Sequence, residues 1–236
     1  LLNKYNIKKS MTSYNNYNKL SKLPYILSEL ENKNIALVSD AGLPCINDPG
    51  QELVISAINS SHEIIPIPGV SSITTAISIS GMIFDQWVFV GFFPKQKSKR
   101  MELLESIIDD KRVTVLLESP HRLQSCFKFL LDNLGDRTIT VCREMTKFYE
   151  DIYRGKISKA IDYFNNPRGE FVILIEGFIN NDINNRTSES DIVAILKNMD
   201  VGELKTKEIV NNVFKKTGFS KKSIYKIWLD LMKEKK

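Results

Sequence analysis

The sequence predicts an α/β fold made of two α/β domains followed by a small C-terminal helical appendage. Three observations lead to this prediction. Short, continuously apolar runs alternate with segments of helical periodicity through most of the chain, a pattern typical of sheets covered by helices. A polar, turn-prone stretch at residues 180–190 then indicates a linker. Beyond this stretch, apolar residues recur only at helical spacing.

The individual elements follow in order along the chain. Strands are predicted where apolar runs are bounded by turn residues, at 35–38, 64–67, 87–93, 113–117, 138–142 and 171–175. Helices are predicted between them, at 50–60, 71–80, 98–109, 120–134 and 157–165. A weakly patterned stretch at 81–86 separates a helix from a strong strand. We therefore predict a first domain over 1–85, a second over 86–180 and the helical appendage over 188–236.

Charge is distributed unevenly along the chain. Residues 203–236 hold ten lysines and four acidic residues, a net charge of +6, whereas the whole chain carries +5. A basic tail on a nearly neutral body favours a polyanionic partner such as RNA. The lysines expected to contact it are Lys215, Lys216, Lys221 and Lys222. A solvated helix face that binds nothing explains this charge equally well.

Several classes of site are disfavoured by the residues present. No two of the 11 glycines lie two residues apart, so a dinucleotide fingerprint is absent. The two histidines, His62 and His121, have no His or Cys at metal-binding spacing, which argues against zinc. Three widely spaced cysteines favour a reducing compartment, so we expect the cytoplasm. No apolar run approaches the roughly 18 residues of a membrane helix.

Two loops stand out, at residues 38–44 (VSDAGLP) and 68–72 (PGVSS). Each follows a predicted strand and precedes a predicted helix, and ligands of open α/β sheets bind beyond the carboxyl ends of strands. Gly42 and Gly50 let the backbone approach a ligand closely, and Asp40 can accept hydrogen bonds from it. Ser71 or Ser72 can cap the following helix. Taken alone, the first loop is equally well explained as a connecting turn, and the second is better explained by plain capping of the helix that follows it.

Three further segments narrow the interpretation: 118–122 (ESPHR), 143–147 (REMTK) and 169–177 (GEFVILIEG). Together with the two loops they resemble the tetrapyrrole-methylase superfamily, in its 16S ribosomal RNA (cytidine-2′-O)-methyltransferase branch. The resemblance covers residues 1 to about 177, with a weaker likeness in the tail. Two departures are visible: Leu43 stands where the family usually has Thr, and the chain starts with what resembles the stretch after the family's first strand and loop.

The resemblance implies that S-adenosylmethionine binds between two α/β domains, at Ser39, Asp40, Leu43, Ser71, Ser72 and Gly155. A general base would help, because a protonated ribose hydroxyl is a poor nucleophile. The candidates follow predicted strands and are Glu118, His121 and Glu144. Arg122, Arg143 and Lys147 would hold RNA phosphates. The structural alternatives are an ion pair of Glu118 with Arg122 and one of Glu144 with Arg143.

We therefore expect a methyltransferase that uses S-adenosylmethionine to methylate a cytidine ribose 2′-hydroxyl of small-subunit (16S) ribosomal RNA. Its partner would be that RNA or the 30S subunit, without metal or membrane, and relatives lead us to expect a homodimer. One alternative is a tetrapyrrole (precorrin-type) methyltransferase, which would need neither the basic tail nor the 118–122 segment. The other is a degenerate, non-catalytic RNA-binding methylase homologue, which would not bind S-adenosylmethionine.

Overall fold

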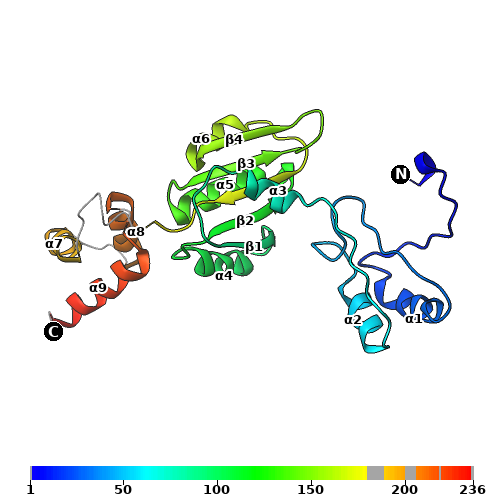
Figure 1. Ribbon diagram of the computed structural model, residues 1–236. Coiled ribbons are helices and arrows are strands. Elements are labelled where there is room, and N and C mark those ends of the chain that lie inside the picture. Colours follow the sequence, from blue (N-terminus) through cyan, green and yellow to red (C-terminus); the bar gives the residue numbers. More distant parts are fainter. Residues whose placement is uncertain (1, 180–188, 200–205, 218, 235–236) are drawn as a thin grey trace. The chain divides into compact units, whose positions relative to one another are not determined.

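The computed structural model describes residues 2–179, 189–199, 206–217 and 219–234, apart from the side chains of Lys215, Lys216, Lys233 and Glu234. The chain divides into two compact units, Leu1–Thr75 and Ala76–Lys236. Figure 1 shows the elements coloured along the sequence. The predicted linker at 180–190 falls mostly on residues outside the described part of the chain. The predicted domain boundary at 85/86 stays a prediction.

The first unit is built around two helices. A short 3-10 helix (Asn3–Tyr5) precedes α1 (Lys19–Leu30) and α2 (Gln51–Asn59), and α3 (Ser72–Ser78) begins at the end of the unit. Ile26 of α1 and Leu53 and Ala57 of α2 are buried, and α1 and α2 are in contact. Lys19 and Glu52 form an ion pair between these helices. The helices predicted at 50–60 and 71–80 are confirmed, whereas α1 was not predicted.

The strands predicted at 35–38 and 64–67 are wrong. Both segments lie outside any strand, and no strand occurs among the described residues of the first unit. Their apolar side chains face solvent, with Val38 79% and Ile67 76% exposed. Apolar, β-branched residues favour extended backbone, but a strand also requires a neighbouring segment whose N–H and C=O groups complete the ladder. Neither segment has such a neighbour here.

The second unit is built on a five-stranded mixed sheet with the strand order β1-β2-β5-β3-β4. The strands are β1 (Trp87–Phe92), β2 (Val113–Glu118), β3 (Thr138–Arg143), β4 (Asp151–Lys156) and β5 (Phe171–Ile175). β1 and β2 are parallel, and the other neighbouring pairs are antiparallel. The α/β class is therefore confirmed, as are the four strands predicted in this part of the chain. β4 was not predicted.

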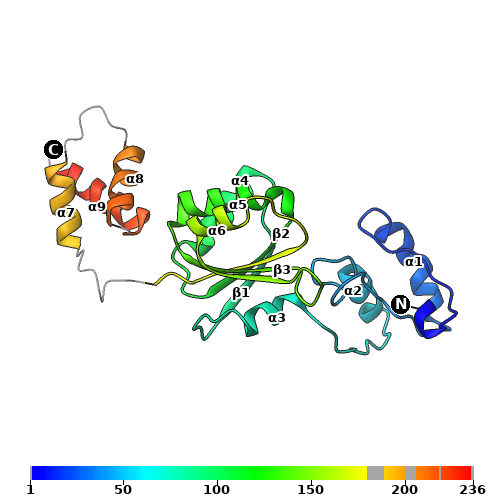
Figure 2. The same ribbon diagram turned by 90° about the horizontal axis from the view of Figure 1, so that it is seen from above.

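One face of the sheet is covered by α4 (Lys97–Ile107), α5 (Pro120–Leu134) and α6 (Ile157–Tyr163), as Figure 2 shows. Side chains alternate across a strand, so Leu116, Ile139 and Ile173 point to these helices and share a core with Leu123 and Phe127 of α5. The helices predicted at 98–109, 120–134 and 157–165 are confirmed.

The opposite face of the central strands is buried as well. Val115 of β2, Thr140 of β3 and Leu174 of β5 point to this side and are almost inaccessible to solvent. The Thr140 hydroxyl donates a hydrogen bond of 2.9 Å to the carbonyl oxygen of Ser80. The segment after α3 therefore crosses this face, and the continuously apolar runs are buried on both sides as the sequence predicts.

The C-terminal appendage consists of α7 (Glu189–Asn198), α8 (Thr206–Thr217) and α9 (Lys221–Glu234). These helices share a core of their own, formed by Ile192, Leu196, Ile209, Val213, Ile224 and Trp228. The spacing of these residues matches one face of each helix. The helical appendage is thereby confirmed for its described residues.

Candidate functional site

The structure brings the two loops of the first unit together. A side-chain carbon added at Gly69 would lie 2.9 Å from Cδ2 of Leu43, and one added at Gly42 would lie 3.7 Å from the carbonyl oxygen of Val70. Gly42 therefore lies close to the backbone of Val70, and the Leu43 side chain lies against Gly69. A larger residue at position 69 would have to displace the tip of the Leu43 side chain.

The first loop is held by its own backbone. The Ser39 hydroxyl donates to the carbonyl oxygens of Ala41 at 3.3 Å and Gly42 at 3.1 Å. Cys45 and Asn47 have φ angles of 68° and 61°, a conformation that non-glycine residues adopt at an energetic cost and that concentrates at ligand sites. Asp40 is exposed, and among the described residues nothing donates a hydrogen bond to its carboxylate.

The second loop leads directly into α3. The carbonyl oxygen of Ser71 accepts hydrogen bonds from the backbone N–H of Thr75 at 3.0 Å and from its hydroxyl at 2.7 Å. Ser71 therefore occupies the capping position that the sequence predicts for it. Ser72, the first residue of α3, is exposed. Asp40 and Ser72 thus present polar groups to solvent from loops that touch.

The second unit gathers a separate set of polar residues at one end of its sheet. Strand register places Glu118 opposite Phe171, and places Phe171 and Asp151 on either side of Arg143. The carboxyl ends of β2 and β3 therefore meet the amino ends of β4 and β5. Residues 118–122, 143–150 and 168–170 emerge at this end, so three of the segments that the sequence singles out lie together.

Glu118 and Arg122 form a buried ion pair. Glu118 accepts hydrogen bonds from Nε of Arg122 at 2.9 Å, from Nη2 of Arg122 at 2.6 Å and from the N–H of Ser119 at 2.7 Å. The Glu118 side chain is 1% exposed, and Arg122 also donates to the carbonyl oxygen of Phe93. The hydrogen bond to Glu118 raises the pKa of Arg122. These contacts favour the structural alternative, because they occupy both groups.

Glu144 forms a second network with Lys147 and Glu170. Its Oε1 accepts from the N–H of Glu170 at 2.8 Å and from Nζ of Lys147 at 3.1 Å, and Lys147 also donates to Oε2 of Glu170 at 2.8 Å. The Glu170 N–H, with Lys147, lowers the pKa of Glu144. A carboxylate held in its ionised form is a weak base. Glu144 therefore pairs with Lys147, not with the expected partner Arg143.

Gly169 makes room for this network. It has a φ of +85°, and a side-chain carbon there would lie 2.4 Å from Cγ of Glu144. We expect Gly169→Ala to lower the free energy of unfolding by about 2–4 kcal/mol, through backbone strain and steric overlap. Urea unfolding followed by Trp87 fluorescence in a Trp228→Phe background would measure this, since the chain has two tryptophans.

Gly81→Ala is the matched control for this substitution. Gly81 has a similar φ of +73°, but an added carbon there would lie no closer than 3.6 Å to Arg154. Gly81→Ala should therefore lower the free energy of unfolding through backbone strain alone, by about 1–2 kcal/mol. An equal loss in both variants would show that Glu144 simply moves aside.

The remaining candidates at this end of the sheet are less constrained. His121 is exposed in the first turn of α5, and its ring makes no hydrogen bond within the described part of the chain. Nε of Arg143 donates to the carbonyl oxygen of Arg168 at 2.7 Å, and Arg168 is exposed. Of the three candidate bases, His121 is therefore the one whose side chain is available to a substrate.

Gly155 lies apart from this group. It pairs with Ile139 near the start of β3, at the other end of the strand from Arg143. A side-chain carbon at Gly155 would lie 2.6 Å from the Tyr153 hydroxyl, so glycine is needed for the packing of this ring. The structure does not bring Gly155 together with Glu118, His121 and Glu144.

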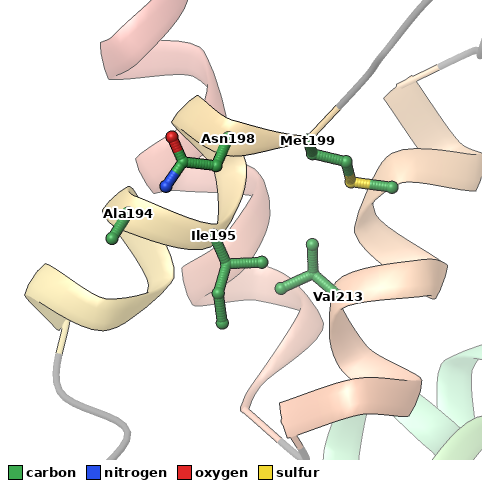
Figure 3. Close-up of a pocket in the computed structure, with 5 residues that line it drawn as sticks. All are labelled: Ala194, Ile195, Asn198, Met199 and Val213. Carbon is green, nitrogen blue, oxygen red and sulfur yellow. The ribbon is translucent and has the colours of Figure 1, made fainter.

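The appendage presents lysines on α9. Lys222 is exposed, whereas Nζ of Lys221 lies 4.7 Å from the centre of the Phe214 ring. The side chains of Lys215 and Lys216 lie outside the described residues. A cavity of about 330 Å³ between α7 and α8 is lined by Ala194, Ile195, Asn198, Met199 and Val213 (Figure 3). Asn198 is its one polar lining residue, so it holds no group for acid–base chemistry.

Sequence reasoning missed Gly169, Glu170 and Arg168, although the first two belong to a segment it singled out. It also missed an exposed aromatic pair, Phe148 and Tyr149, which directly follows the REMTK segment. No group of His, Cys, Asp and Glu among the described residues could hold a metal ion. No described helix has the length and apolar character of a membrane span.

Comparison with known proteins identifies the family. Residues 5–161 match the family of tetrapyrrole (corrin/porphyrin) methylases. Proteins named ribosomal RNA small subunit methyltransferase I are similar: that of Halalkalibacterium halodurans is 41% identical over 75% of this chain and 62% of its own length. That of Thermotoga maritima is 42% identical over 75% of this chain and 81% of its own length. That of Synechocystis is 36% identical over 98% of this chain and 84% of its own length.

The solved structures agree with the sequence relatives in fold. The methyltransferase CobJ is 15% identical and superimposes with a TM-score of 0.50 over 67% of this chain and 71% of its own. An identity this low supports the fold alone. The sequence relatives go further, and the chain belongs to the tetrapyrrole (corrin/porphyrin) methylase family, within which it groups with the ribosomal RNA small subunit methyltransferase I proteins.

Proposed function

We propose that this protein transfers a methyl group from S-adenosylmethionine to a cytidine ribose 2′-hydroxyl of small-subunit (16S) ribosomal RNA. The observation that carries the proposal is the contact between residues 42–43 and 69–70, with Asp40 left exposed beside it. The names of the relatives support the RNA substrate. The match spans 62% of the length of the Halalkalibacterium relative, so the relative's activity is a proposal for this chain.

The loops of the first unit fit a cofactor of this kind. S-adenosylmethionine supplies a methyl group on a positively charged sulfur and carries an amino group and two ribose hydroxyls. The Asp40 carboxylate can accept hydrogen bonds from such donors, and Ser71 and Ser72 can donate or accept them. The glycines at 42 and 69 leave the backbone open to close approach. Leu43 is partly buried and would offer an apolar contact.

The second unit would supply the groups that act on the RNA. Methyl transfer depends mainly on holding the donor and the hydroxyl in line, so a base is an aid and not the main source of rate. His121 is the best placed of the three candidates, since Glu118 is tied to Arg122 and Glu144 to Lys147 and Glu170. Arg143 and Arg168 can contact phosphates, whereas Arg122 and Lys147 are engaged by carboxylates.

A transfer assay tests the proposal. The purified chain, methyl-labelled S-adenosylmethionine and 30S subunits lacking the modification are combined, and RNA nucleosides are analysed by mass spectrometry for 2′-O-methylcytidine. Calorimetric titration with S-adenosylmethionine gives the binding step separately. RNA binding without cofactor binding would identify a non-catalytic homologue. Labelling of a precorrin-type tetrapyrrole in place of RNA would identify the other alternative.

The basic appendage is proposed as a second RNA contact. Changing Lys215, Lys216, Lys221 and Lys222 to Gln should weaken RNA binding and flatten its salt dependence by up to about 3 units of slope, because fewer counterions are released. A matched variant neutralises four lysines elsewhere, Lys8, Lys9, Lys95 and Lys128, all exposed. Equal affinity and slope in both variants would show that the appendage is a structural cap.

Cytoplasmic location and a homodimer complete the proposal. Ribosomal RNA is available in the cytoplasm, and sedimentation of the purified chain measures its oligomeric state.

A further inference from the structure

Two aromatic side chains project from the loop between β3 and β4. Phe148 is 93% exposed and Tyr149 is 67% exposed. Their ring centres lie 5.0 Å apart with an angle of 89° between the ring planes. In such an edge-to-face pair, the edge of one ring meets a face of the other. The remaining faces are left to solvent or to a ligand.

The loop that carries these rings is held in a defined conformation. Glu144 and Thr146 have φ angles of 46° and 64°, a backbone conformation that residues other than glycine rarely adopt. The N–H of Thr146 donates to Oε2 of Glu150 at 2.6 Å, and the N–H of Lys147 donates to the carbonyl oxygen of Glu144 at 3.0 Å. Lys147 then fastens the loop to Glu144 and Glu170. Strained backbone kept in place by several contacts is a feature of binding sites.

The surroundings of the pair limit what can bind there. The loop residues Thr146, Lys147 and Glu150 are polar and exposed, so they add no apolar surface to the two rings. A stable protein–protein interface needs roughly 800 Å² on each partner, which two rings in a polar setting do not offer. A flat, unpaired nucleobase needs only a ring face.

Charge points to stacking as the source of affinity at this loop. Three cations, Arg143, Lys147 and Arg168, lie near four carboxylates, those of Glu144, Glu150, Asp151 and Glu170. Lys147 is engaged by two of these carboxylates. The net charge of this set is −1 (three cations and four carboxylates), so the phosphate contacts open to Arg143 and Arg168 add less affinity here than those of the basic appendage.

We propose that Phe148 and Tyr149 form a stacking platform for an unpaired base of the RNA substrate, at the end of the sheet that carries His121 and Arg143. This inference rests on the proposed function, since it specifies how the same RNA is held. The platform binds a base through its flat face and so selects single-stranded RNA over paired RNA. It contributes affinity that is independent of salt, because no counterion is released when a base stacks.

The test compares Phe148→Ala and Tyr149→Ala with the wild-type full chain, using fluorescently labelled small-subunit ribosomal RNA at several salt concentrations. Each substitution is expected to lower affinity roughly 5- to 150-fold, the range for loss of one stacked base, with the slope of log K against log salt unchanged. Phe148→Tyr and Tyr149→Phe should keep wild-type affinity because they keep the rings. Tyr17→Ala, at a fully exposed tyrosine of the first unit, is the control and should bind as wild type.

Several outcomes would overturn the platform. Unchanged RNA affinity in both alanine variants would do so, as would an altered salt slope. A lower unfolding midpoint, or loss of S-adenosylmethionine binding, would show that the rings pack against the rest of the chain. Altered sedimentation without RNA would show that they pack against a second copy. If the wild-type chain itself neither binds nor methylates this RNA, the proposed function is wrong. If the wild-type chain binds the RNA and both alanine variants bind it equally well, only the platform is wrong.

Discussion

Replacing Arg122 with methionine is expected to lower the free energy of unfolding of the second unit by about 3–5 kcal/mol. The substitution keeps most of the apolar stem of the side chain but leaves the Glu118 carboxylate buried, and among the described residues the N–H of Ser119 is then its one donor. An uncompensated buried charge is far more costly than a lost surface contact. The same urea assay, with Trp87 as reporter, would measure the loss.

Lys99→Met provides the comparison for this variant. Lys99 and Glu102 form an ion pair at 2.9 Å whose side chains are 60% and 61% exposed, and such pairs contribute less than about 1 kcal/mol. The double variant Glu118→Gln with Arg122→Met should recover part of the loss, because the buried charge is gone. If Arg122→Met unfolds within about 1 kcal/mol of wild type, the ion pair is not what secures the start of α5.

Asp40→Ala is expected to weaken S-adenosylmethionine binding by about 10- to 150-fold, the equivalent of roughly 1.5–3 kcal/mol for a hydrogen bond to a charged group. The side chain is exposed and has no donor among the described residues, so its removal should leave stability unchanged. Calorimetric titration measures the affinity, and circular dichroism checks the fold.

Asp48→Ala serves as the control for the cofactor prediction. Asp48 is an exposed acid in the same segment before α2. The substitution Asp48→Ala therefore removes the same charge from a different position. Equal weakening in both variants would point to a general charge effect. If Asp40→Ala binds S-adenosylmethionine with wild-type affinity, the 38–44 loop is only a connecting turn.

The five-stranded sheet of the second unit could be predicted largely from the sequence because its central strands are buried on both faces. β2, β3 and β5 appear as short, continuous apolar runs. β4 escaped prediction because it is an edge strand of mixed polarity, Asp-Ile-Tyr-Arg-Gly-Lys, whose partly exposed residues carry no apolar pattern. Helix α1 was missed because Pro24 lies within it, and proline usually ends or bends a helix.

The site was predictable only as a set of segments. The sequence placed 118–122 and 143–147 after strands, and strand order then brought these segments together. The spacing of Glu118 and Arg122, four residues apart in a helix, made their pairing foreseeable. The partners of Glu144 were not foreseeable, since the Glu170 N–H belongs to a segment 26 residues away and depends on how β5 joins β3.

The position of β5 has a consequence for how the protein is made. β5 lies at the centre of the sheet, between β2 and β3, yet of the five strands of this sheet it is the last to leave the ribosome. Until residue 175 emerges, β1–β2 and β3–β4 are two separate ribbons, and the edges of β2 and β3 that β5 will later occupy are unpaired. The ends of β2 and β5, Glu118 and Ile175, are 57 residues apart. At about 5–20 residues per second, synthesis of these residues keeps the β2 edge open for several seconds. Unpaired strand edges are prone to misassociation, so the nascent chain is most vulnerable just before its fifth strand is inserted.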